Sequence, residues 1–152
     1  MNLILSLALA LNPGQPPKLP DPEIDPFISA LVKPDDRDTP LRRLQKERVR
    51  LWGLAASDIK DQWDKGRGAD YREAVELPGA LWRNAAELAA NPADAVTCHE
   101  KRVEAAKEWE KFVADRVASG GLIPHYLHMS KATRIDAEIG LLKLKEATKG
   151  GK

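Results

Sequence analysis

Glycine and proline punctuation constrains this chain more than any other feature, because it leaves four uninterrupted segments of helical length. The stretch "KGRGAD" (65–70) holds two glycines, which favour a turn. "NPAD" (91–94) ends one segment and starts the next, with Asn91 as N-cap and Pro92 at the first helical position. "SGGLIP" (119–124) repeats this arrangement. The sequence therefore predicts helices over 39–65, 70–90, 92–118 and 124–147.

The composition between residues 41 and 147 agrees with this assignment, since Ala, Leu, Glu, Lys and Arg dominate it. Helices of these lengths are roughly 30–40 Å long at 1.5 Å per residue. Long helices joined by short turns lie antiparallel to their neighbours. We therefore predict an all-α fold of two long antiparallel helical hairpins in an elongated, coiled-coil-like four-helix arrangement.

The two predicted hairpins resemble each other. A shift of about 54 residues places Arg48-Val49 on Arg102-Val103 and Gly66 on Gly120. Apolar residues recur in alternating steps of three and four, the spacing of a coiled-coil-like seam. Two arrangements follow: a narrow four-helix bundle, or a curved sheet of helices that awaits a partner. The predicted seam residues are Val49, Trp52, Ala56, Ile59 and Trp63; Tyr71, Ala74, Pro78, Leu81, Ala85 and Leu88; Val103, Ala106, Glu110, Val113 and Val117; and His125, His128, Ala132, Ile135, Ile139 and Leu142.

Two residues depart from this apolar pattern. Pro78, followed by Gly79, lies on the second seam, and proline costs about 3 kcal/mol in a helix interior. We therefore expect a kink or break near Leu77. Glu110 lies on the third seam, where it is tolerable if the seam is exposed or wet.

The first 40 residues differ in character from the rest. The apolar run from Leu3 to Leu11 is too short to span a bilayer, and it is typical of a secretory signal, although no Lys or Arg precedes it. Cleavage after Ala10 would remove residues 1–10. We predict export to the periplasm or cell envelope, with a cytoplasmic location as the alternative.

Residues 11–40 are rich in proline: eight of the 11 prolines fall between Pro13 and Pro40. Each ring removes a hydrogen-bond donor and restricts the preceding residue, so we predict an extended or disordered segment. Within it, Phe27, Ile28, Leu31 and Val32 suit one short helical turn that docks on the rest. Residues 41–147 form the predicted double-hairpin domain, and 148–152 a disordered tail.

One stretch, "RVASGGLIP" followed by "KATRIDAEIGLLKLKE" (116–146), resembles the helical hairpin repeat of outer-membrane efflux proteins, the TolC-like channel-tunnels. In that family a helix ends at a glycine tip, and the next carries a pattern like A-x-x-R-L-x-A-E-I-x-L-L. Residues 131–142 match the end of this pattern well. Residues 63–88 are a looser copy. The resemblance implies a tunnel-like hairpin module that cannot form a channel alone, since no stretch here has the alternation of a barrel strand. Leu127 replaces the family's usual acidic residue, which argues against adaptor docking.

His125 and His128 are three residues apart, a spacing that can chelate a metal ion. The pair supplies only two ligands, whereas zinc sites use three or four. A third would have to come from Asp64, Asp70 or Glu73 at the other hairpin tip. We predict no metal and assign both histidines to the first steps of the fourth seam. The alternative is a sensor or regulatory domain whose histidine tip responds to metal or pH.

Catalytic motifs are missing from the sequence, which has no nucleophile elbow, no HExxH and no phosphate loop. Cys98 and His99 are adjacent, but neighbours on a helix point about 100° apart, so we predict a structural thiol rather than a dyad. The four tryptophans fall on or beside the seams, where packing is expected; an exposed one would mark a partner surface.

The net charge of +1 gives no electrostatic case for nucleic acid or an anionic membrane. We therefore predict a non-catalytic helical scaffold or interaction module without a cofactor or small-molecule substrate. Its expected contacts are a protein partner or self-association through helical faces, and it would meet a membrane only indirectly.

Overall fold

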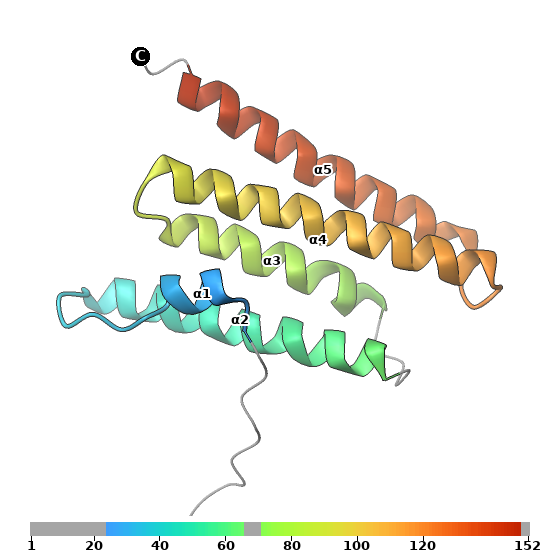
Figure 1. Cartoon of the computed structure of the whole chain (residues 1–152), viewed down its shortest axis with the longest axis horizontal. Helices are drawn as coiled ribbons and strands as arrows, with labels where there is room; N and C mark the ends of the chain where they lie inside the picture. The colour runs from blue at the N-terminus through green and yellow to red at the C-terminus, as the bar shows by residue number, and fades with distance from the viewer. Residues whose placement is uncertain (1–23, 66–70, 150–152) are drawn as a thin grey trace, which may run out of the picture.

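The computed structural model describes residues 24–65 and 71–149, with the side chains of residues 64 and 71–75 excepted. This part of the chain is helical and contains no strand, which confirms the all-α prediction (Figure 1). Each predicted long helix is present, with ends within two residues of those expected. No described helix is long and apolar enough to cross a membrane. The helices are α1 (Pro26–Leu31), α2 (Pro40–Asp64), α3 (Tyr71–Leu88), α4 (Pro92–Ala118) and α5 (Pro124–Lys149).

Capping residues fix the starts of α2 and α4. The side chain of Asn91 accepts a hydrogen bond from the backbone N–H of Asp94 over 2.9 Å, and Thr39 does the same for Arg42 over 3.2 Å. In both cases a proline at the first helical position follows the cap, where its missing N–H costs nothing. The N-cap predicted at Asn91 is therefore confirmed.

Neighbouring helices along the chain pack against each other: α2 against α3, α3 against α4, and α4 against α5. The α3 helix also touches α5, whereas α2 contacts neither α4 nor α5 through its backbone. The described helices thus form an open row rather than a closed four-helix bundle (Figure 1). The 54-residue repeat itself stays a prediction.

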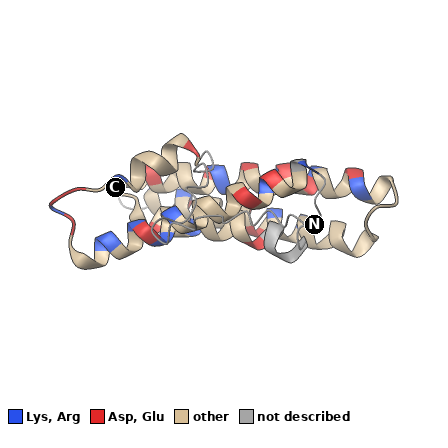
Figure 2. Ribbon diagram, turned by 90° about the horizontal axis from the view of Figure 1, so that it is seen from below, with Lys and Arg blue, Asp and Glu red and all other residues tan. Residues whose placement is uncertain are grey.

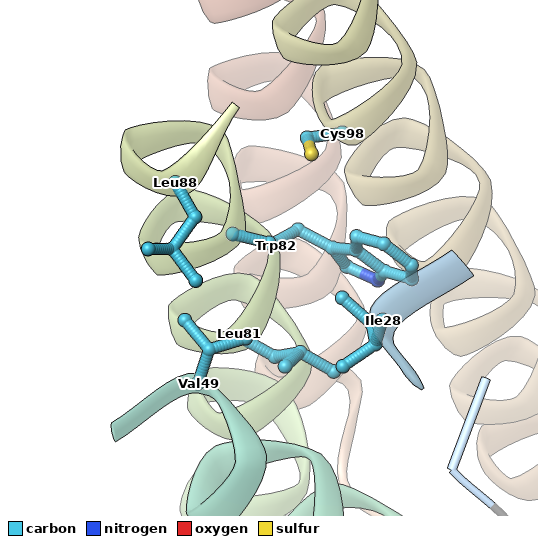
Figure 3. Packing of buried hydrophobic residues seen from close by; sticks show 7 residues of the cluster. Ile28, Val49, Leu81, Trp82, Leu88 and Cys98 are labelled. Atoms are coloured by element: carbon cyan, nitrogen blue, oxygen red, sulfur yellow. The ribbon is translucent and has the colours of Figure 1, made fainter. Parts of the chain in front are cut away.

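The main core lies between α1, α2, α3 and the first turns of α4. Figure 3 shows its side chains meeting from these four elements. Three of the predicted seams contribute to burial, since the described seam residues of α2, α3 and α4 are all buried or partly buried. The buried core residues are Ile28, Val49, Leu81, Trp82, Ala85, Leu88 and Cys98.

The α1 helix confirms the short helical turn predicted within the proline-rich segment, since Phe27, Ile28, Leu31 and Val32 all pack in the main core. It is short but ordered by packing, because Ile28 is completely buried. Gly53 of α2 makes the close approach possible: a Cβ at Gly53 would lie only 3.2 Å from Cγ2 of Ile24. Asp25 caps the helix by accepting from the N–H of Phe27 at 2.8 Å. The residues of this segment before Ile24 lie outside the described part.

We expected a kink or break near Leu77; the break does not occur, since α3 continues through Pro78. The proline ring removes one hydrogen bond of the helix, the one that its N–H would donate four residues back. The α3 helix lies in the interior of the row, with α2 on one side and α4 on the other. Packing on both sides offsets the lost bond.

The seam predicted for α5 is wrong. Ile135, Ile139 and Leu142 are 47%, 44% and 60% exposed, whereas the residues that α5 buries are Ser130 and Ala137. The α5 helix packs on α4 through its small residues instead, because these allow the two backbones to approach. The predicted first steps of this seam, His125 and His128, are exposed as well.

Candidate functional site

The predicted histidine pair lies on the first turns of α5. Both side chains are exposed, and the His125 ring lies 5.8 Å from that of Tyr126. Among the described residues, no group of three or more His, Cys, Asp or Glu side chains is placed to hold a metal ion. The other ligands considered from the sequence, Asp64, Asp70 and Glu73, lie outside the described side chains. The described part of the chain therefore brings no third ligand to this pair.

Cys98 and His99 take different places in the fold. Burial raises the pKa of the Cys98 thiol to about 11, and the nearby carboxylate of Asp94 adds to this shift. The thiol is therefore protonated at neutral pH and packs in the main core. His99 lies beside α5, where a Cβ on Gly140 would be 3.5 Å from its Nδ1. Burial lowers the pKa of His99, and the positive charge of Arg102 lowers it further.

An aromatic cluster joins α2 to α4. The ring of Trp63 on α2 meets those of Trp109 and Phe112 on α4 edge-on, with centroids 5.2 and 5.0 Å away. Trp109 and Phe112 stack on each other at 5.2 Å, and the guanidinium of Arg116 lies 5.4 Å from the centre of the Phe112 ring. Aromatic pairs of this geometry attract each other beyond the area they bury. Large side chains thus bridge two helices whose backbones do not meet.

This cluster forms one side of a groove of about 470 Å³, which we call the aromatic groove. Ile24 and Asp25 line one end of it, and Lys60 and Glu108 also contribute to its lining. The buried Nε1 of Trp63 finds no hydrogen-bond acceptor among the described residues. The principal apolar lining residues are Ile59, Trp63, Pro78, Trp82, Trp109 and Phe112.

A second hollow, of about 880 Å³, lies between residues 32–38 and α2 and is lined by charged side chains. These charged side chains pair with one another: Lys46 lies 2.6 Å from Asp38, and Arg50 lies 2.8 Å from Glu47. The hollow is therefore an internally neutralised surface rather than a cluster of free ligands.

The outer face of α5 carries exposed apolar side chains. His128, Ala132, Ile135, Ile139 and Leu142 recur at steps of four and three, so they share one side of the helix. We call these five residues the outer stripe. It points away from α4, since the buried residues of α5 lie on the opposite side. A contiguous exposed apolar patch typically marks an interaction site.

The other end of the row is also apolar. The α2 helix exposes Leu41, Leu44 and Leu51, which lie toward one side of the helix. Figure 2 shows Lys and Arg residues interspersed with Asp and Glu residues along the described helices, as seen from below. The surface therefore offers apolar contacts at the edge helices rather than an electrostatic binding face.

Comparison with known protein families, with curated proteins and with solved structures finds no match for this chain. Sequence reasoning placed Trp63 and Trp109 on or beside seams, but it missed the groove that they form. One signal was available in the sequence. Trp63 lies just before the expected turn at 65–70, and Trp109 and Phe112 lie on the helix expected over 92–118.

Proposed function

We propose that this protein is a non-catalytic helical scaffold that associates with a second copy of itself through the outer stripe of α5. The supporting observation is the exposure of Ile135, Ile139 and Leu142 on a helix whose other side is already packed. Burying such side chains removes apolar area from water, at about 25 cal/mol per Å². A partner helix is the simplest structure that covers a straight stripe of this kind.

The pattern of the outer stripe is complementary to itself when two α5 helices run antiparallel. In a coiled-coil contact, residues spaced by three and four form successive layers across the interface. Two antiparallel α5 helices whose contact is centred between positions 135 and 139 place each large apolar residue opposite a small one or one of equal size. At each end of the contact a histidine lies opposite a carboxylate. The resulting pairs are Ile135 with Ile139, Ala132 with Leu142, and His128 with Glu146.

The resemblance to efflux-protein hairpins agrees with a role in assembly. The stretch that carries it, residues 131–142, is the stretch that presents most of the outer stripe. We propose that the module works in the periplasm or cell envelope after removal of residues 1–10. N-terminal sequencing of the protein from cell fractions tests this location, and a full-length product in the cytosol would contradict it.

Sedimentation equilibrium over a range of concentrations tests the self-association. The wild-type chain should show a mass that rises from one copy to two. Ile139→Glu should remain at one copy, because a carboxylate would be buried in the interface without a partner. Leu41→Glu is the matched control, since it makes the same kind of change at an exposed apolar residue of α2. Loss of association in the control alone would place the interface on α2 and overturn the proposal.

A further inference from the structure

We propose that the aromatic groove binds the proline-rich segment of the same chain, residues 12–23. The described chain starts beside this groove, since Ile24 and Asp25 are among its lining residues. The segment in question is therefore attached directly at one end of the groove. This inference does not depend on the outer stripe of α5.

The course of α1 shows from which side the chain arrives. Just before α1 begins, Ile24 lies against Gly53, in the middle of α2. Near the end of α1, Leu31 lines a hollow together with Arg42 and Leu88, close to the start of α2. The α1 helix thus runs opposite to α2 (Figure 1), so a chain that continues its line before Ile24 extends toward the carboxyl end of α2, where Trp63 lies.

The chemistry of the groove fits such a segment. Residues 12–23, "NPGQPPKLPDPE", contain five prolines and favour the polyproline II conformation. Grooves lined with aromatic side chains recognise this conformation, because its rigid form costs little entropy on binding. Its backbone carbonyls make no internal hydrogen bonds, so they are free to accept from a binding site.

The length of the segment is sufficient. Gly53 and Trp63 are ten residues apart on one helix, about 15 Å at 1.5 Å per residue. A polyproline II chain covers this distance with about five residues at 3.1 Å each.

Hydrogen exchange of the tryptophan indole N–H groups, followed by NMR on the full chain, tests this proposal. The variant replaces Pro16, Pro17, Pro20 and Pro22 with glycine, which keeps the length of the segment but removes its stiffness. The Trp63 indole should exchange at least about tenfold faster in the variant, because local opening then exposes it. The indole of Trp52, which does not line the groove, should be unchanged and serves as the internal control.

A peptide of residues 12–23 provides the matched test in trans. Added to the glycine variant, it should restore slow exchange at Trp63, whereas the same peptide with its prolines replaced by glycine should not. Identical Trp63 exchange in the wild type and the variant would overturn the proposal. Slow exchange of the Trp63 indole that appears only at high protein concentration would overturn the proposal as well, because a second copy of the chain would then occupy the groove.

Discussion

Arg134 of α5 donates a hydrogen bond from Nε to a carboxylate oxygen of Glu110 on α4 over 2.6 Å. Its Nη1 donates to Glu138, one turn along α5, over 2.8 Å. The guanidinium thus holds two carboxylates and links the last two helices of the row. This contact explains why Glu110 is tolerated at a position where the pattern expects an apolar residue.

We predict that Glu110→Gln and Arg134→Gln each lower the melting temperature slightly, and that the double variant loses less than the sum of the two. Both side chains are partly exposed, so the coupling is modest and weakens in high salt. Thermal unfolding of the four proteins at low and high salt measures it. Lys107→Gln is the control, because Lys107 is more exposed and lies 3.8 Å from Glu138. Strictly additive losses would show that the bond between Arg134 and Glu110 contributes nothing.

The Cys98 thiol should resist alkylation in the folded protein. Its pKa is raised from 9.0 to about 11. At pH 8 this leaves about a hundredfold less thiolate than in the unfolded chain, since each pKa unit is a factor of ten. Burial slows the reaction further. Iodoacetamide labelling followed by mass spectrometry should show little modification until guanidinium is added. Rapid labelling of the native protein would contradict the buried position.

The raised pKa of the Cys98 thiol predicts a pH dependence of stability. Between pH 9 and 11 the unfolded chain loses the Cys98 proton while the folded chain retains it, so the free energy of unfolding falls as the pH rises through this window. Below pH 9 the contribution is fully present. The melting temperature of the wild type should therefore fall more steeply than that of Cys98→Ala over this range. Parallel curves for the two proteins would contradict the assignment.

Pro78→Ala should stabilise the protein. Alanine restores the backbone N–H inside α3, worth up to about 3 kcal/mol in a helix interior. Part of this gain is lost because the ring is partly buried at the aromatic groove, so a net gain of about 2 kcal/mol is expected. Differential scanning calorimetry measures it as a rise in melting temperature. A fall instead would mean that ring packing outweighs the restored bond.

Leu88 and Leu44 form a matched pair for testing the core. Leu88 is completely buried, and Leu44 is 70% exposed. Leu88→Ala should lower the free energy of unfolding by about 2–5 kcal/mol, because it removes buried methyl groups and leaves a cavity. Leu44→Ala should change it by less than about 0.5 kcal/mol. Urea unfolding of both variants gives the comparison, and equal losses would place the core elsewhere.

The helix boundaries could be predicted because they depend on local chemistry. Asn91 with Pro92 starts a helix whatever the tertiary contacts of that helix. The turn after Ala118 places Gly120 at a φ of +76°, a backbone conformation that suits glycine. Pro78 shows the limit of such reasoning. A proline in isolation predicts a break, but helices packed on both sides of α3 override that tendency.

The packing face of α5 could not be predicted, because its sequence offers two faces of different kinds. The larger apolar residues, such as Ile135 and Ile139, suggest a core, while Ser130, Ala137 and Gly140 are small. The structure uses the small face, since a Cβ at Gly140 would meet Arg102 of α4 at 3.4 Å. The aromatic groove was missed for a related reason: Trp63 meets α4 only because of how three helices are placed.

Disulfide crosslinking across the outer stripe tests the central claim most directly. Two variants are made in a Cys98→Ala background, one with Ile135→Cys and the other with Ile139→Cys, and are then mixed. One of the two is labelled with ¹⁵N, so that mixed and self-linked dimers differ in mass. The antiparallel pairing of α5 helices predicts that the mixed dimer forms fastest, with no comparable dimer when Leu41→Cys replaces either partner. Self-linked dimers of each variant in preference to the mixed one would contradict the antiparallel pairing, and no linked dimer at all would contradict the association through α5.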